Sequence, residues 1–353
     1  MRICFVVGDV RAQQPTYAGV YLALAAHRRG AEVRFVSVDD LSFLDDNTIL
    51  AVTRRVRHGQ YAQTADYARA LGSDEAVVEE DNLGSFDVVF LRYNPGRETA
   101  GPAGAPLRVG APVIDFAWRL RLGGTLVVND PEGLRRAGSR MYLGDFPADI
   151  RARSLVSRSA PELKQWVRAL RGPAVLKPLQ PHGGEHVFVV KPRQVSNLNQ
   201  IITTVTKSGY AIAQEYVPGV EQGEKRLLFL GAEPIRVGKR IAIYRRHPVI
   251  GNPDSAATET SGTRSRCEFG PAEARICELV RPKLLADGLY FVGADIVGDK
   301  LLELNVFTPG GIHSVFELYG IDVAEVVVRD LERRVRLRAA YRTTFDPEAA
   351  DTV

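Results

Sequence analysis

Three oxygen-bearing side chains lie inside one apolar segment near the end of the chain. The segment from Phe291 to Phe307 reads FVGADIVGDKLLELNVF and places Asp295, Glu303 and Asn305 among valines, isoleucines and leucines. An unpaired carboxylate is costly to bury, so acids in such strands normally lie on a solvated face or around a cation. Carboxylate and amide oxygens suit Mg²⁺, which takes its remaining ligands from water and phosphates. The segment is therefore a candidate magnesium site or a strand pair with a solvated acidic face.

The turn between the two strands decides whether these side chains share a face. Side chains alternate along a strand, so Glu303 and Asn305 lie on the same side. A three-residue turn at 298–300 would bring Asp295 to that side, whereas a two-residue turn at 298–299 would place it on the other. A magnesium site requires the shared face, and we expect Asp295 to lie directly across from Glu303.

A lysine interrupts another apolar strand. Lys177 lies in AVLKPL, and the sequence QPHGG follows at 180–184. A strand lysine beside glycines, whose bare backbone N–H groups can approach a ligand, is a suitable cradle for a polyphosphate. A lysine reaching outward from an edge strand before an ordinary turn would give the same pattern.

A third segment has the features of a base-binding strand. Residues 211–219 read AIAQEYVPG and end at a Pro-Gly break. Adenine needs an apolar slot with backbone donors and acceptors at its edge, which extended backbone at Glu215, Tyr216 and Val217 could supply. Glu224 could then bond a ribose hydroxyl. An ordinary edge strand is the alternative.

Alternating strands and helices in the first part of the chain predict an open, parallel α/β sheet. The strand and helix patterns fall at residues 2–7, 16–30, 31–38, 86–95 and 124–130. No GxGxxG follows the first strand, which argues against a dinucleotide cofactor there. Between the last two strands, residues 95–113 are rich in Gly and Pro, and we expect a surface loop.

The second part of the chain predicts an α+β arrangement, because strands joined by short turns replace the alternation. Strands are expected at 174–179, 186–190, 210–217, 225–237 and 240–244, and helices at 196–209, 271–288 and 322–341. A long polar segment at 245–270 is expected to be a lid or a disordered loop.

Length and composition indicate a globular protein of two or three domains. The chain has 353 residues, of which 45% are hydrophobic and 25% charged, which excludes disordered, collagen-like and membrane classes. The net charge is only +4 and no nucleic-acid motif is present, so we expect no nucleic-acid partner. Neither a signal peptide nor a bilayer-spanning segment is recognisable, so we expect a cytoplasmic protein with no membrane partner. The three cysteines lack metal or redox spacing.

In this order, the segments resemble the ATP-grasp ligases, and they are most similar to bacterial glutathione synthetases. The likeness covers roughly residues 1–330 and rests on RRGAEVRFVSVDDL, LVVNDPEGLR, LKPLQPHGG, AQEYVPGVEQGEKR, GAEPI and GLYFVGADIVGDKLLELNV. It implies an α/β fold in which an N-terminal open parallel (pre-ATP-grasp) domain precedes two α+β ATP-grasp subdomains. The expected boundaries are 1–128, 129–210 for the lid with the phosphate loop, 211–340 for the subdomain with the metal site, and 341–353 for a tail.

The resemblance also implies an activity and a set of site residues. An ATP-dependent ligase of this kind activates a carboxylate as an acyl phosphate, and an amine then forms the amide. ATP would be bound by Arg140, Lys177, Gly183, Gly184, Gln214, Glu215, Tyr216, Val217 and Glu224. Two Mg²⁺ ions, or Mn²⁺ in their place, would be held by Asp295, Glu303 and Asn305. Arg226 and Arg240 would be catalytic, and Asn252, Thr308, Pro309 and Gly310 would contact substrate.

Those substrates would be a small carboxylate donor and an amine acceptor, either an amino acid or a dipeptide. The resemblance further implies a homodimer or a homotetramer.

Several positions depart from the family pattern. Arg140 replaces a lysine, which keeps the charge but changes the geometry, and Pro181 and His182 alter the phosphate loop. Ile250 stands where the family has a substrate-binding arginine before Gly-Asn, and residues 307–314 read FTPGGIHS rather than a Ser-Pro-Thr run. We therefore expect retained nucleotide chemistry and altered substrate recognition.

Two other functions compete with the ligase. One is a non-catalytic ATP-binding regulatory or scaffold protein on an ATP-grasp fold, and the other is a carboxylating enzyme that uses bicarbonate. Retention of Lys177 together with Asp295, Glu303 and Asn305 favours an enzyme. The N-terminal likeness favours the peptide-forming branch.

Overall fold

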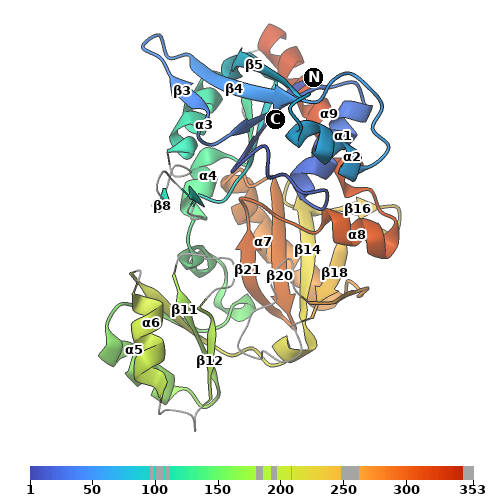
Figure 1. Ribbon diagram of the computed structural model, residues 1–353. Coiled ribbons are helices and arrows are strands. Elements are labelled where there is room, and N and C mark those ends of the chain that lie inside the picture. Colours follow the sequence, from blue (N-terminus) through green and yellow to red (C-terminus); the bar gives the residue numbers. More distant parts are fainter. Residues whose placement is uncertain are drawn as a thin grey trace. The chain divides into compact units, whose positions relative to one another are not determined.

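The protein is described by a computed structural model (Figure 1) that covers residues 1–95, 99–100, 106–107, 112–179, 186–191, 197–207, 209–247 and 262–344. The chain divides into two compact units. The first comprises Met1–Leu134, Gly288–Phe291 and Phe307–Val353, and the second comprises Arg135–Asp287 and Val292–Val306. Within the described residues, no helix has the length and apolar character needed to cross a membrane.

The first unit is built on a sheet whose central strands run parallel, as predicted. Strand β1 pairs in parallel with β2 and β6, and β6 pairs in parallel with β9. On the far side of β2, strands β4, β3 and β5 add antiparallel pairings that the sequence did not predict. The strands are β1 (Arg2–Val7), β2 (Glu32–Ser37), β3 (Leu41–Phe43), β4 (Ile49–Arg55), β5 (Val77–Asn82), β6 (Val88–Arg92) and β9 (Leu126–Val128).

Apolar packing on the parallel strands forms the core of this unit. The ring of Phe5 stacks on Phe35 and Phe90 at centroid distances of 5.2 and 5.7 Å. Helix α1 packs against α2, α8 and α9, so the last helices of the chain fold with its first strands. The helices are α1 (Ala18–Arg28), α2 (Thr64–Gly72), α3 (Val113–Leu122), α4 (Pro131–Arg136), α8 (Ile312–Tyr319) and α9 (Val323–Thr344), with a 3-10 turn η1 (Leu83–Ser85) and a short β7–β8 pair (Thr99–Ala100, Pro106–Leu107).

The second unit contains an antiparallel sheet with helices on one face (Figure 1). Its order is β10-β13-β11-β12, formed by Ser154–Ser157, Ala211–Glu215, Ala174–Pro178 and Phe188–Val190. Helices α5 (Ala160–Ala169) and α6 (Leu198–Thr206) cover it through a core that includes Leu163, Leu176, Ile202 and Val205. This is the α+β layout that the sequence predicted.

A second sheet in the same unit carries the predicted hairpin. Its order is β19-β18-β14-β20-β21, and β15 pairs with β14. The strands are β14 (Glu224–Leu230), β15 (Glu233–Pro234), β18 (Ile243–Arg246), β19 (Arg264–Ser265), β20 (Phe291–Val297) and β21 (Lys300–Asn305), and a separate pair is formed by β16 (Arg236–Val237) and β17 (Arg240–Ile241). Helix α7 (Pro271–Ala286) and the 3-10 helices η3 (Arg140–Asp145), η4 (Ala148–Ile150) and η6 (Val220–Gln222) complete the unit.

The hairpin brings the three candidate metal ligands to one face. Val297 pairs with Lys300, so of the two turns considered the structure has the two-residue one. In a regular ladder this turn would place Asp295 on the opposite face. A β-bulge directly after Asp295 shifts the register by one residue, so Asp295 pairs with Glu303. Because Asn305 follows two residues later, the shared face is confirmed.

Some predicted features lie outside the described residues. They are Pro181, His182, Gly183, Gly184, Ile250, Asn252, most of the Gly/Pro-rich segment and positions 248–261 of the long polar segment. The described remainder of that polar segment includes β19, which pairs with β18.

Strand β14 begins directly after a glycine whose conformation excludes other residues. Gly223 has φ of +95°, and a Cβ atom built there would lie 2.3 Å from the carbonyl oxygen of Arg246. We predict that Gly223→Ala lowers the free energy of unfolding by about 3 kcal/mol, because strain and a backbone clash add together. Urea denaturation measures the loss. Gly172→Ala is the control, since nothing lies within 4 Å of its added Cβ and its φ is not positive. Equal stability of the two variants would contradict the prediction.

Candidate active site

Asp295 is the centre of a buried cluster of charges. Its side chain is 1% exposed. Arg226 donates from Nε to Oδ1 at 2.5 Å and from Nη2 to Oδ2 at 2.9 Å. Arg246 and Asn305 donate to Oδ2 at 2.9 and 3.0 Å. Burial would raise the pKa of Asp295, but the two guanidinium groups and these hydrogen bonds outweigh it and hold the pKa below its usual value.

A second carboxylate, Glu224, shares Arg246 with Asp295. It begins β14 two positions before Arg226, so both side chains project from the same face, and it pairs across the ladder with Arg246. The Arg246 guanidinium forms a salt bridge to its carboxylate. Burial and the negative charge of Asp295 raise the pKa of Glu224 to about 7, against the attraction of both arginines. The sequence predicted that Glu224 bonds a ribose hydroxyl. In the structure its carboxylate contacts the buried charge cluster.

Glu303 is far more accessible than Asp295. Its side chain is 36% exposed, and its Oε1 lies 3.4 Å from Nη2 of Arg140. Arg140 also donates from Nη1 to the carbonyl oxygen of Pro178 at 2.9 Å. This arginine therefore connects the end of β11 with the face of β21 that carries the candidate metal ligands.

The oxygen donors fit a divalent cation in part. Glu303 offers a half-exposed carboxylate, and Asn305 binds Asp295 through its nitrogen, so its amide oxygen is not used in that bond. Both oxygens of Asp295, in contrast, accept from arginines. No group of three or more His, Cys, Asp or Glu side chains in the described part of the chain is arranged to hold a metal. The hairpin therefore suits a cation that takes most of its ligands from phosphates and water.

Lys177 lies on β11 with its ammonium group largely removed from water. Its Nζ donates to Oε1 of Gln214 at 3.2 Å, and Gln214 on β13 is itself buried. Burial, followed by the positive charge of Arg140, lowers the pKa of Lys177 to about 8, while Glu303 and Glu224 oppose the shift. Lys177 and Arg140 together form a cationic pair suited to phosphate oxygens.

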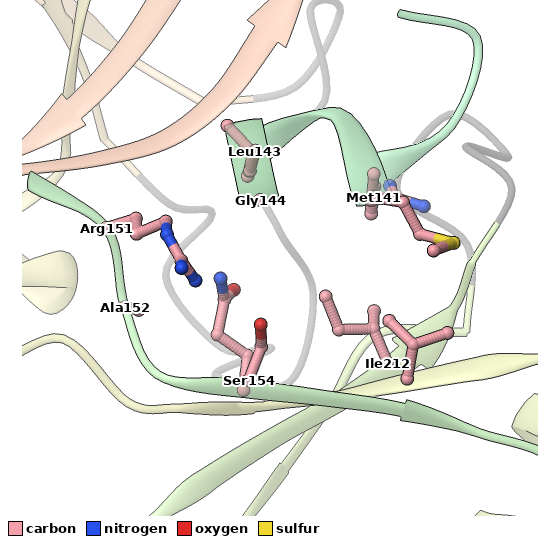
Figure 2. Close-up of a pocket in the computed structure, with 10 residues that line it drawn as sticks. Met141, Leu143, Gly144, Arg151, Ala152, Ser154 and Ile212 are labelled. Atoms are coloured by element: carbon pink, nitrogen blue, oxygen red, sulfur yellow. The ribbon is translucent and has the colours of Figure 1, made fainter. Parts of the chain in front are cut away.

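A pocket of about 530 Å³, counting its open mouth, lies between η3 and the β10–β13 pair. Its lining residues are Arg140, Met141, Leu143, Gly144, Arg151, Ala152, Ser154, Val156, Ile212 and Gln214. Figure 2 shows Met141 and Leu143 on one side, Ser154 and Ile212 on the other, and the guanidinium group of Arg151 directed into the space. Apolar walls with a few convergent polar groups are typical of a small-molecule site.

The strand end predicted to hold adenine follows the expected extended path only to Glu215. The Glu215 carboxylate accepts from the backbone N–H of Arg153 at 3.1 Å. The hydroxyl of Tyr216 donates to Glu221 at 2.9 Å. Val217 then begins a turn, since its carbonyl oxygen accepts from Val220 N–H at 3.4 Å. The backbone N–H groups of Glu215 and Tyr216 also donate, to the carbonyl oxygens of Arg153 and Pro173 at 2.9 and 3.0 Å, so the binding of adenine here stays a prediction.

The predicted site residues are not all brought together. Arg240 is exposed on β17, whereas Arg246 on β18 lies in the buried cluster. The sequence analysis did not assign Arg246 to the site, because nothing in Arg245-Arg246 tells which side chain faces inward. It also missed Arg151, for which we find no signal in the sequence.

Thr308, Pro309 and Gly310 belong to the first unit, whereas the hairpin with the candidate metal ligands belongs mainly to the second. The carbonyl oxygen of Pro309 accepts from Nη2 of Arg92 at 3.1 Å. Their predicted contact with substrate stays a prediction.

Comparison with known families gives a match over both parts of the chain. Residues 1–135 match the model for the prokaryotic glutathione synthetase N-terminal domain, and residues 139–320 match the model for the prokaryotic glutathione synthetase ATP-grasp domain.

Curated relatives match nearly end to end. Glutathione synthetase of Bradyrhizobium diazoefficiens is 31% identical over 321 residues, which are 89% of this chain and 91% of the relative. That of Vibrio vulnificus is 30% identical over 325 residues, 90% of this chain and 92% of the relative. That of Synechococcus elongatus is 29% identical, covering 95% of this chain and 99% of the relative.

Among solved structures, D-cycloserine synthetase DcsG matches with a TM-score of 0.65 at 15% identity, covering 94% of this chain and 99% of its own. The ATP-grasp ligase PsnB, complexed with a minimal precursor, matches with a TM-score of 0.57 at 14% identity, covering 94% and 98%. At these identities the likeness shows the fold alone.

We predict that Glu303→Gln lowers the rate of ATP consumption at least about tenfold, because the loss of one carboxylate weakens the binding of a divalent cation. The apparent Mg²⁺ requirement should rise, while the melting temperature stays near that of the wild type, since Glu303 is half exposed. Glu278→Gln, an exposed change on α7, is the control and should alter neither quantity. Wild-type turnover in Glu303→Gln would remove Glu303 from the metal site.

A second prediction concerns pH. Because the pKa of Lys177 is lowered to about 8, its positive charge is lost as the pH rises through that value. The kcat/KM for ATP should therefore fall above about pH 8, since this ratio reports groups of the free enzyme. Lys177→Arg keeps its charge at these pH values and should remove the fall. Identical pH profiles for the two proteins would contradict the role of Lys177.

Proposed function

We propose, on the premise that this chain belongs to the prokaryotic glutathione synthetase family, that it forms an amide bond through an acyl phosphate and prefers a substrate other than γ-glutamylcysteine. The chain is an ATP-dependent carbon–nitrogen ligase with an ATP-grasp fold. Its family uses ATP and divalent metal ions in general. The acyl phosphate, the number of ions and the altered substrate are the proposal.

The observation that carries the proposal is the gathering of cations and oxygen donors within the second unit. Arg226 and Arg246 meet Asp295 in the buried cluster, and Arg140 lies beside Glu303. Phosphoryl transfer needs mainly alignment of the reacting atoms and neutralisation of phosphate charge. Arg140 beside the accessible Glu303 would supply this neutralisation, and the buried cluster would keep the neighbouring side chains aligned.

In the proposed reaction, an oxygen of the substrate carboxylate attacks the γ-phosphorus of ATP, and the bond to ADP breaks. The amine nitrogen then attacks the acyl carbon, inorganic phosphate leaves, and the amine gives up a proton. Lys177 and Arg140 would hold the nucleotide phosphates, and Arg226 would contact the transferring group or the substrate carboxylate. Arg246, unlike the exposed Arg240, lies in the buried cluster, where it would orient Asp295 and Glu224 rather than contact substrate.

Glu303 and Asn305, with Asp295, would hold two divalent ions. Bound there, Mg²⁺ would neutralise the phosphate charge. The oligomeric state, as a homodimer or homotetramer, and the cytoplasmic location stay predictions.

Altered substrate recognition is supported by the absence of the arginine that the family carries at the place of Ile250. Two nearby arginines are already engaged. Arg246 pairs with Glu224 and Asp295, and Arg245 donates to the carbonyl oxygen of Gly223 at 3.2 Å. Neither guanidinium group can bind a substrate carboxylate in place of the missing arginine without breaking these contacts.

A phosphate-release assay with panels of carboxylate donors and amine acceptors tests the proposal. We predict that γ-glutamylcysteine with glycine gives a kcat/KM about ten- to a few hundredfold below the best pair, because one charged pair of hydrogen bonds is lost. An efficient reaction with that pair would identify a glutathione-forming enzyme instead. Binding of Mg-ATP without ADP release for any pair would favour the regulatory or scaffold alternative.

A further inference from the structure

The short helix η3 contacts two different parts of the second unit. Arg140, Met141, Leu143 and Gly144 line the pocket (Figure 2). Tyr142 does not line it and is 5% exposed. Its hydroxyl donates to Oδ2 of Asp287 at 2.7 Å. One side of η3 therefore forms a wall of the pocket, and Tyr142 joins it to the end of α7.

Asp287 is a buried carboxylate surrounded by donors. Its side chain is 1% exposed. Besides the Tyr142 hydroxyl, it accepts from Nη1 of Arg136 at 2.9 Å and lies 3.1 Å from Nζ of Lys283. Burial alone would raise the pKa of Asp287, but these three partners outweigh it and hold the pKa below its usual value. The carboxylate is thus a fixed acceptor at the C-cap of α7.

Lys283 adds a second connection between α7 and η3. Its Nζ lies 3.1 Å from Oδ2 of Asp145, the last residue of η3, and 5.4 Å from the centroid of the Tyr142 ring. A 3-10 helix has poorer hydrogen-bond geometry than an α-helix, and six residues hold few bonds of their own. The conformation of η3 therefore depends on contacts outside it, and Tyr142 and Asp145 provide those with the C-terminal end of α7.

We propose that Asp287 is a positioning residue that acts through Tyr142 to fix η3, and so sets the affinity of the pocket for the nucleotide. This rests on the proposed function, since it takes the pocket as a nucleotide site. Neither residue needs to touch the ligand. Asp287 holds the hydroxyl of Tyr142, the Tyr142 backbone holds its neighbours Met141 and Leu143, and those side chains shape the pocket wall.

The test removes one hydroxyl and leaves the buried charges paired. In Tyr142→Phe, Asp287 keeps Arg136 and Lys283, so the protein should fold. Hydrogen exchange of the η3 amides should become several times faster in the ligand-free protein. The dissociation constant of Mg-ATP, measured by titration calorimetry, should rise about fivefold, the effect of one net hydrogen bond. KM for ATP should rise to a similar extent with kcat nearly unchanged.

The first unit offers a matched control. Tyr290 donates its hydroxyl to Asp330 at 2.7 Å, and Arg333 and Arg334 also bind that carboxylate. Tyr290→Phe therefore removes a bond of the same kind and length that has no part in η3. It should lower the melting temperature to a similar extent while leaving η3 exchange and ATP affinity at their wild-type values.

Each outcome decides between the alternatives. Faster η3 exchange with weaker ATP binding in Tyr142→Phe, and neither change in Tyr290→Phe, supports the positioning role. Unchanged exchange, or faster exchange with unchanged ATP affinity, overturns it and leaves the bond a contribution to stability only. Failure of the wild-type protein to bind Mg-ATP would instead overturn the proposed function, and with it the nucleotide part of this inference.

Discussion

The buried pair of Arg226 and Asp295 is the interaction on which the candidate site depends. The two side chains are 2% and 1% exposed, and they join β14 to β20 near the middle of the sheet. Two charges removed from water are tolerable only while they stay paired, and removing one partner of such a pair typically costs about 3–5 kcal/mol. The pair therefore fixes both the sheet and the orientation of the neighbouring polar groups.

The other charged groups of the candidate site extend outward from this pair. Arg246 bridges Asp295 and Glu224, and Asn305 adds a neutral donor. Glu303 lies on the same strand face but nearer to solvent, beside Arg140. The buried charges of the site are thus paired with each other, and the charges at its edge are accessible to solvent. An oxygen-rich ligand and its cation can bind at this edge at a lower desolvation cost.

The family, the α/β fold and the ligase class could be predicted from the sequence and are confirmed, because they depend on long apolar patterns and on the order of several motifs. Details that depend on strand register could not. When two neighbouring residues are identical, as Arg245 and Arg246 are, the sequence does not reveal which side chain faces inward. The pairing of β18 with β14 decides it. The antiparallel strands β3 to β5 were not predicted, because β3 has three residues, β4 ends in two arginines and half of β5 is acidic, so their apolar patterns are weak.

The bulge after Asp295 makes the hairpin sensitive to the parity of its length. Seven residues separate Asp295 from Glu303: two form the turn, four form the pairs Ile296–Leu301 and Val297–Lys300, and one is unpaired. A single insertion or deletion in this interval would move the inward-facing side chains of one strand to its outer face, unless a second insertion or deletion restored the original spacing. Related chains can therefore lengthen this turn only by an even number of residues. The spacing of the two acids is thus a stricter marker of this site than the identity of the residues between them.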